Sequence, residues 1–232
     1  MEKVFFYIDG FNFYNGLRKG SRRKWKKFYW IDINRFCQQF IKENQELTQV
    51  KYFTAKPLNI KKRNRQDSLL KVNKAINGET FKIYQGKHFK KKIRCGASCN
   101  EEFIKHEEKQ TDVSIATHIL EDYILEKCDK SIIITADSDL IPVIETVSRL
   151  NNKLKRDHLM EVLFPPNNTC HDIKNRANKG TIDCIVKDLI NYKSRFNKSI
   201  LPIEKTINGK TYKIPSKWER HLRKSKSHKT VQ

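Results

Sequence analysis

Apolar residues recur along this chain with two different spacings, and the two spacings alternate from one segment to the next. Short, nearly continuous apolar runs predict buried strands, because a strand covered on both faces has no side that must stay polar. Longer stretches with apolar residues every three or four positions predict helices with one buried face. The expected strands are 4–8, 47–55, 80–84, 131–135, 159–164 and 181–186, and the expected helices are 31–41, 59–76, 112–126, 140–150 and 170–178.

This alternation predicts an α/β domain with a central, mainly parallel sheet, since parallel neighbours need a crossover that a helix provides. Helices on both faces of the sheet make three layers, the Rossmannoid arrangement. We expect one main domain over residues 1–200 and a small basic extension over residues 201–232. In the extension, Asn208-Gly209 favours a hairpin turn, and the lysine-rich end is expected to fray after Trp218.

Residues 86–110 show a third pattern, with little apolar periodicity and many lysines, which predicts a long basic loop. Two cysteines and two histidines in this segment make a complete tetrahedral donor set for a zinc ion, namely Cys95, Cys99, His88 and His106. Their spacing differs from that of a standard zinc knuckle. Ordinary packing of reduced cysteines is therefore the alternative.

The charge of the chain narrows the class of partner. It has 48 Lys and Arg residues against 26 Asp and Glu, a formal net charge of +22. Such an excess favours a polyanionic partner, and nucleic acid is the first candidate. The residues expected to contact RNA are Arg22, Arg23, Lys24, Lys90, Lys91, Lys92 and Arg94. Rings are interleaved with them: Trp25, Tyr29 and Phe89 are candidates for stacking on bases, whereas Phe28 and Trp30 are assigned to the core.

The sequence indicates a cytoplasmic protein. No apolar run approaches the length of a membrane span, and the basic residues are not confined to one amphipathic helix, so no membrane partner is expected. The N-terminus lacks the cleavage site of a secretory signal, and six cysteines in 232 residues do not make a disulfide scaffold. The oligomeric state is left open, with a homodimer among the alternatives.

Three acids stand where a parallel sheet would bring them together. Asp9 ends the first strand, Asp112 opens a long helix, and Asp137 ends the strand SIIIT; Asp139, two residues further on, is the fourth candidate ligand for the metal. In open α/β sheets this edge is where ligands bind. Grouped carboxylates repel one another unless a divalent cation neutralises them, and oxygen-only ligation selects Mg²⁺ or Mn²⁺. Each acid alone is also a common cap or surface residue, and Asp139 is well placed to cap the helix 140–150.

Four segments of the chain resemble successive motifs of NYN domains in the PIN-like nuclease superfamily, in the bacterial LabA-like branch. They span roughly Lys3 to Lys187 and read FFYIDGFNFYNGL, EEKQTDVSIATHIL, SIIITADSDLIPVIETV and VLFPPN. The resemblance implies a PIN-like fold and a Mg²⁺- or Mn²⁺-dependent endoribonuclease. The site residues that it implies are the metal-binding Asp9, Asp112 and Asp137, Asn12 near the scissile phosphate, and Asp139 as the second acid of its motif.

Three positions depart from the pattern of these domains. Ala136 replaces the usual glycine, His118 stands where an aspartate is common, and Asn178 stands where an aspartate often precedes the last strand. The change at His118 matters most, because it removes a negative charge; a partly buried helix histidine is the simpler interpretation. The alternative to an enzyme is a catalytically silent RNA-binding or protein-interaction module. A retained set of five site residues favours the enzyme.

Overall fold

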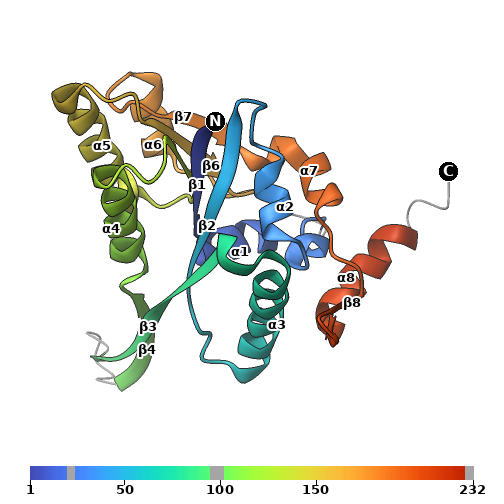
Figure 1. The fold of residues 1–232 in the computed structure, drawn as a ribbon. Helices are drawn as coiled ribbons and strands as arrows, with labels where there is room; N and C mark the ends of the chain where they lie inside the picture. Colours follow the sequence, from blue (N-terminus) through green and yellow to red (C-terminus); the bar gives the residue numbers. More distant parts are fainter. Residues whose placement is uncertain (20–23, 95–101, 228–232) are drawn as a thin grey trace.

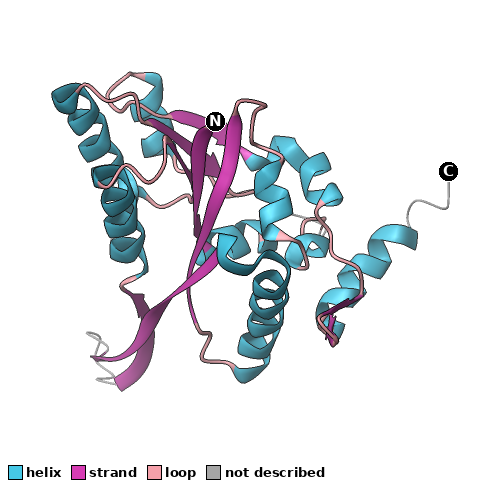
Figure 2. Cartoon of the chain, in the orientation of Figure 1, coloured by secondary structure: helices cyan, strands magenta, loops and turns pink. Residues whose placement is uncertain are grey.

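The computed structural model describes residues 1–19, 24–94 and 102–227, with side chains for residues 1–19, 24–87 and 110–223. In this part of the chain, one sheet lies between two groups of helices (Figures 1 and 2). Its strand order is β4-β3-β2-β1-β5-β6-β7. The strands are β1 Glu2–Asp9, β2 Gln45–Ala55, β3 Phe81–Arg94, β4 Glu102–Lys109, β5 Lys130–Ile134, β6 Leu159–Phe164 and β7 Ile185–Asp188.

Every neighbouring pair from β3 to β7 is parallel, and β4 runs antiparallel to β3. This confirms the predicted three-layer α/β fold with a mainly parallel sheet. The two central strands pair in register, with Phe6 of β1 beside Ile132 of β5. Because both strands are covered on both faces, nearly all of their residues are buried, which is the reason for their continuous apolar runs.

Helices cover the two faces of the sheet and divide the core into two clusters. On one face, Phe13, Phe36 and Leu70 come from α1, α2 and α3; on the other, Ile115 and Ile144 come from α4 and α5. The helices are α1 Gly10–Arg18, α2 Ile33–Gln38, α3 Ile60–Asn77, α4 Thr111–Ile124, α5 Ile141–Leu154, α6 His171–Asn178, α7 Lys193–Lys198 and α8 Ser216–Ser227. Among the described residues, no helix combines the length and the apolar character needed to cross a lipid bilayer.

The aromatic residues of the first basic segment belong to the core. Phe28 and Trp30 are fully buried, as predicted. The prediction that Trp25 and Tyr29 would stack on bases is wrong, because both side chains are buried too. The Trp25 ring lies 5.3 Å from that of Phe196, and the Tyr29 ring lies 5.4 Å from that of Trp218. This apolar cluster explains why rings occur between lysines here.

Residues 86–110 do not form the predicted long loop. Strand β3 continues to Arg94 and returns as β4, with Lys90 paired to His106 (Figure 1). The lysines concealed the strand, because lysine is uncommon in strands and the segment shows no alternation of apolar and polar residues. Cys95 and Cys99 lie outside the described residues, and the side chains of His88 and His106 are not described, so the zinc site stays a prediction.

The last strand of the sheet begins four residues later than predicted, at Ile185 rather than at 181. Gly180, with a φ of 68°, ends α6, and a turn follows it. Ile182 in this turn is 1% exposed, and the backbone N–H of Asp183 donates to the Ser148 hydroxyl at 3.1 Å. The apolar signal at 181–186 therefore came partly from a buried turn residue.

The C-terminal segment folds against the domain. Strands β8 Glu204–Ile207 and β9 Lys210–Lys213 form a separate antiparallel pair, and α8 follows. Trp218 and Leu222 of α8 are buried in the same core cluster as Tyr29. The prediction that the chain frays after Trp218 is wrong, because α8 continues to Ser227 and one face of it supplies apolar residues to the core.

A buried ion pair joins the centre of the sheet to α4. The Lys51 ammonium of β2 contacts Asp122 Oδ2, and both side chains are almost inaccessible, at 4% and 0% exposure. The Tyr7 hydroxyl of β1 donates to the same oxygen at 2.7 Å. Burial holds the pKa of Tyr7 well above its ordinary value, with electrostatic interactions with Cys128 and Asp122 adding to the effect. Three elements therefore depend on one carboxylate.

The buried side chain of His158 makes the stability of the protein depend on pH. His158 donates from Nδ1 to the Cys128 carbonyl at 3.2 Å and accepts at Nε2 from the Ser131 hydroxyl at 2.9 Å. Burial lowers its pKa below the ordinary 6.5. The unfolded chain therefore binds the proton more tightly than the folded chain. The contribution of neutral His158 to stability is complete above about pH 6.5, the ordinary pKa, and is lost as the pH falls through the lower pKa of the folded chain. His158→Gln should flatten this fall in thermal melts, whereas the exposed His171→Gln should not; equal slopes for His158→Gln and the parent would contradict the assignment.

Candidate metal centre

Asp9 joins the first strand to the first helix. Its Oδ1 accepts from the backbone N–H of Asn12 at 2.9 Å, which caps α1. The turn is tight, because a Cβ on Gly10 would lie 2.6 Å from the Tyr52 ring and 2.8 Å from the Phe53 carbonyl oxygen. Only glycine fits such an approach. The carboxylate is therefore held in one place at the carboxyl edge of the sheet, where it is 2% exposed.

Asp137 stands at the equivalent point after β5. Its Oδ1 accepts from the backbone N–H of Asp139 at 3.0 Å, which caps the short 3₁₀ helix Ser138–Leu140 before α5. The prediction that Asp139 would be the cap is thus wrong, since Asp137 holds that position and Asp139 is exposed. Thr135 links the two strand ends: its hydroxyl donates to Asp9 Oδ2 and accepts from the Asp137 N–H, both at 3.1 Å.

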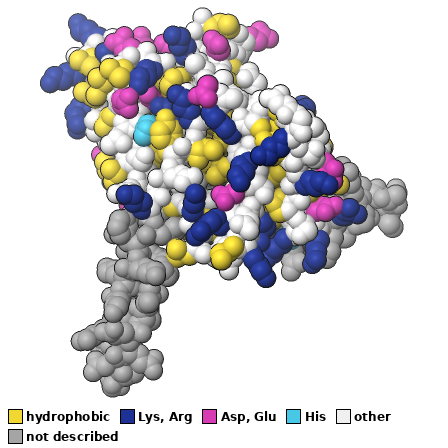
Figure 3. Space-filling view, turned by 60° about the horizontal axis from the view of Figure 1, so that its bottom comes forward, with side chains coloured by type: hydrophobic (Ala, Val, Ile, Leu, Met, Phe, Trp, Pro, Cys, Tyr) yellow, Lys and Arg dark blue, Asp and Glu magenta, His cyan; other side chains and the backbone are white. Residues whose placement is uncertain are grey.

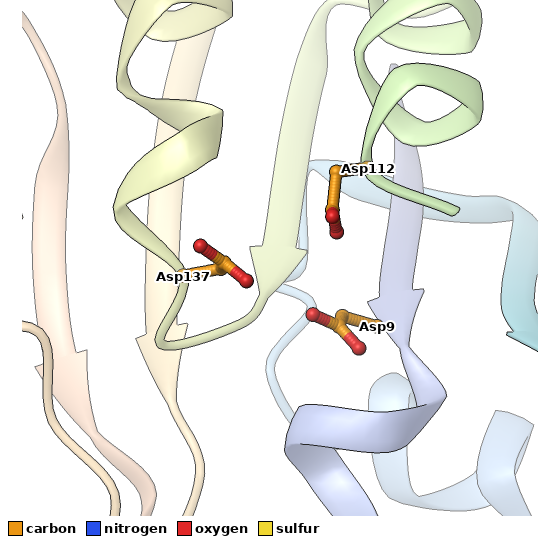
Figure 4. Close-up of side chains that lie close together, drawn as sticks. All are labelled: Asp9, Asp112 and Asp137. Carbon is orange, nitrogen blue, oxygen red and sulfur yellow. The ribbon is translucent and has the colours of Figure 1, made fainter. Parts of the chain in front are cut away.

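The third carboxylate comes from α4, where Asp112 lies in the first turn. One ligand oxygen from each of Asp9, Asp112 and Asp137 lies within 4.8 Å of the others. Figure 4 shows the three side chains pointing toward one another from the end of β1, the start of α4 and the loop after β5. The structure thus brings together the three acids that the sequence singled out. We refer to them as the acidic triad.

Each acid of the triad lies at the N-terminus of a helical element, namely α1, α4 and the 3₁₀ turn that leads into α5. The partial positive charge of these ends offsets part of the repulsion between the carboxylates. Burial nevertheless raises the pKa of Asp9, and the negative charge of Asp137 adds to this, while hydrogen bonds from Asn12 and Thr135 oppose it. A bound cation would relieve the remaining repulsion. Three convergent carboxylates with oxygen donors alone fit Mg²⁺ or Mn²⁺.

Asn12 holds Asp9 rather than facing outward. Its Nδ2 donates to Asp9 Oδ2 at 2.6 Å, and its Oδ1 accepts from Asn168 Nδ2 at 2.8 Å. Asn168 in turn accepts from the Lys19 ammonium at 2.7 Å. Sequence reasoning missed Thr135 and Asn168. Both stand inside the segments TADSD and PPNN, where the polar residues beside the acids were the available signal.

His118 and Lys24 are not part of the described acidic triad. His118 is partly buried on α4, where its Nδ1 donates to the Ser114 carbonyl at 2.7 Å and its ring lies 4.1 Å from that of Tyr84. This agrees with an ordinary packed histidine. Lys24 is exposed. Arg22 and Arg23 fall outside the described residues. The backbone of Lys90, Lys91, Lys92 and Arg94 lies on β3, and their side chains are not described.

Comparison with known proteins identifies the family. The model of the NYN domain family matches residues 3–183, most of the chain. This chain belongs to the NYN domain family. NYN domains are part of the PIN-like nuclease superfamily and are generally ribonuclease-like, so the sheet described above is the PIN-like fold that the sequence motifs implied. The LabA-like branch stays a prediction.

Two individual proteins resemble this NYN domain. One is 6-hydroxy-3-succinoylpyridine 3-monooxygenase HspA of Pseudomonas putida (strain DSM 28022 / S16), 26% identical over 171 residues, which are 61% of this chain and 54% of that protein. The chain thus spans about half the length of this curated relative. The other is a crystal structure of a protein of unknown function from Vibrio parahaemolyticus RIMD 2210633, with a TM-score of 0.50, 18% identity, and coverage of 81% of this chain and 93% of that one. This second likeness concerns the fold alone.

Proposed function

We propose that this NYN domain is a metal-dependent endoribonuclease that hydrolyses phosphodiester bonds in RNA. The observation that carries the proposal is the acidic triad, whose oxygens lie within 4.8 Å of one another at the carboxyl edge of the sheet. A group of like charges is a cost to the folded chain and has no structural benefit that a neutral cap would not supply. Its position and its donor set support a role in binding a divalent cation.

Asp9, Asp112 and Asp137 would hold Mg²⁺ or Mn²⁺, which when bound lowers the pKa of a coordinated water and stabilises negative charge on the phosphate. Asn12 acts as a positioning residue, since it donates to Asp9 from both its backbone and its side chain. Asp139 is exposed two residues from Asp137, where its carboxylate can accept hydrogen bonds from water at the rim of the site.

The charge of the protein supports RNA as the substrate. Figure 3 turns the lower side of the domain in Figure 1, where the parallel strands end, toward the viewer, and Lys and Arg side chains are spread across the face that it shows. With a formal net charge of +22, the chain attracts a polyanion to this face before any specific contact forms. The predicted contacts of Lys24 and of the basic residues in β3 remain part of the proposal.

The test is cleavage of a circular RNA and of its linear form, each with Mg²⁺, with Mn²⁺ or with a chelator. We expect both RNAs to be cut when metal is present and neither with the chelator. Cutting of the circle shows an endonuclease, because a circle has no end for an exonuclease. RNA that is bound but left intact under all metal conditions would contradict the proposal and support the silent RNA-binding module.

A further inference from the structure

A cleft of about 210 Å³ opens between α1, the end of β2, α3 and α8. Its wall begins at Gly10, the residue that follows Asp9 in the chain. Rings and apolar side chains make up much of the rest, including Phe11, Tyr14, Tyr52, Leu69 and Trp218. Phe11 is 57% exposed, which is unusual for a phenylalanine in a domain with a large core. An apolar surface of this kind is suited to a flat, uncharged ring.

The same cleft carries positive charge along one side. Arg18, Lys62 and Arg65 line it, and within the described part of the chain none of the three is paired with a carboxylate. A second hollow of about 200 Å³ shares these residues and adds Lys26 and Lys217. Cations that have no carboxylate partner among the described residues, placed around an apolar cleft, call for a ligand that is apolar at one end and anionic at the other.

Gln66 gives a third indication of a ligand. Its Nε2 donates to the Thr54 hydroxyl at 2.7 Å and more weakly to the Ala55 carbonyl at 3.4 Å, which fixes the orientation of the carboxamide. Its Oε1 is buried without a hydrogen-bond partner among the described residues. A buried acceptor is rarely left unsatisfied in a folded protein. Gln66 lines the cleft, and this unsatisfied acceptor is the polar group there that a ligand N–H would have to reach.

A nucleotide has the chemistry that these features require. The volume of about 210 Å³ lies below that of pockets for drug-sized ligands, so the cleft suits one ring system rather than a whole cofactor. We propose that it holds one base of a single-stranded RNA, with the adjoining phosphates on Arg18, Lys62 and Arg65. The inference rests on the proposed nuclease function, because the strand it holds would pass the acidic triad next to Gly10.

Two consequences follow for the substrate. A base in a cleft cannot also be stacked and paired in a duplex, so the subsite selects single-stranded RNA. Because α8 forms part of the wall, the C-terminal extension takes part in binding rather than being an appendage. Lys217 on α8 lies across from α1 and α3 and would add a phosphate contact from that extension.

The test measures RNA binding in a chelator, so that no cleavage or metal contributes. Anisotropy of a short, labelled single-stranded RNA should show roughly tenfold weaker binding for Phe11→Ala, since stacking of a base on a ring is typically lost in this range. Leu125→Ala is the matched control, because Leu125 is equally exposed, at 59%, and lies outside the cleft. An RNA whose nucleotides lack bases should bind Phe11→Ala and the parent equally.

The phosphate contacts are tested by salt. Arg65→Gln and Lys217→Gln should each reduce the slope of log Kd against log salt by about 0.7, the value for one phosphate of a single strand. Lys153→Gln on α5, also exposed, should leave the slope unchanged. Equal affinity of Phe11→Ala and the parent for normal RNA would overturn the subsite, whether or not the parent cuts RNA. Weaker binding by Phe11→Ala in a protein that never cuts RNA would support the subsite and overturn the nuclease instead.

Discussion

Replacing Asp137 by asparagine should lower metal-dependent RNA cleavage by more than about 100-fold, beyond the range typical when only a hydrogen-bonding partner of a metal ligand is lost. The carboxamide keeps the oxygen that caps the 3₁₀ turn by accepting from the N–H of Asp139 at 3.0 Å. It loses the negative charge and one oxygen that point at Asp9 and Asp112. The measurement is the initial rate of cleavage of labelled RNA at saturating Mg²⁺, together with a thermal melt without metal.

Two further variants make this prediction specific. Asp183→Asn changes an exposed aspartate in the turn after α6 and should cleave at the parent's rate. Asp139→Asn changes the exposed neighbour of Asp137 and should have an intermediate effect, because it lies at the rim rather than in the triad. The melt of Asp137→Asn should match that of the parent or exceed it, since one of three repelling charges is gone. A parent-like cleavage rate for Asp137→Asn would remove this residue from the site.

Replacing Lys51 by methionine should destabilise the protein by about 3–5 kcal/mol, the range found when one partner of a buried ion pair is removed. Methionine fills most of the volume, so the loss is mainly electrostatic. Asp122 would remain fully buried with the Tyr7 hydroxyl as its donor at 2.7 Å, and with the Lys127 ammonium at 3.4 Å from its other oxygen. Denaturant unfolding followed by fluorescence measures the change.

An exposed ion pair gives the matched control. Lys213 contacts Glu204 at 2.8 Å in the β8–β9 pair, with both side chains more than half exposed. Lys213→Met should cost less than about 1 kcal/mol, as is usual for a surface pair. In the double variant with Asp122→Leu, the stranded charge is removed, so the loss should be smaller than the sum of the two single losses. A loss below about 1 kcal/mol for Lys51→Met would contradict the stabilising role of the pair.

The sequence was enough to find the triad because two general rules apply to it. Continuous apolar runs mark parallel strands, and parallel strands bring their carboxyl ends to one edge. Asp9 and Asp137 follow such runs directly. The first turn of α4 lies close to the same edge, so Asp112 joins them. Which carboxylate serves as a cap could not be predicted, since Asp137 and Asp139 are both acceptors and only the local backbone decides between them.

The cleft could not be predicted from the sequence, because its walls come from four separate elements. Lys62 and Arg65 have the spacing of an ordinary solvent-exposed helix face, and nothing in α3 indicates that α8 lies opposite. Trp218 stands near the end of a lysine-rich segment where the hydrophobic signal is weak. The arm of β3 and β4, which extends from the rest of the domain in Figure 1, was missed because its many lysines interrupt any alternating apolar pattern. Hydrophobic patterns in a sequence indicate which residues pack in the core, and they carry little information about the cleft or about the arm of β3 and β4.

The two edge strands of the sheet also affect whether copies of this protein associate with one another. An outer strand exposes unpaired N–H and carbonyl groups that can recruit a strand from a second molecule, and aggregation begins in this way. Here one outer strand is β4, Glu102–Lys109, in which five of eight residues are Asp, Glu, Lys or Arg, and the other is β7, only 4 residues long. Charge discourages such recruitment at the first edge, and shortness limits it at the second. The two edge strands therefore limit the addition of strands from other molecules to a sheet whose central strands are almost wholly apolar.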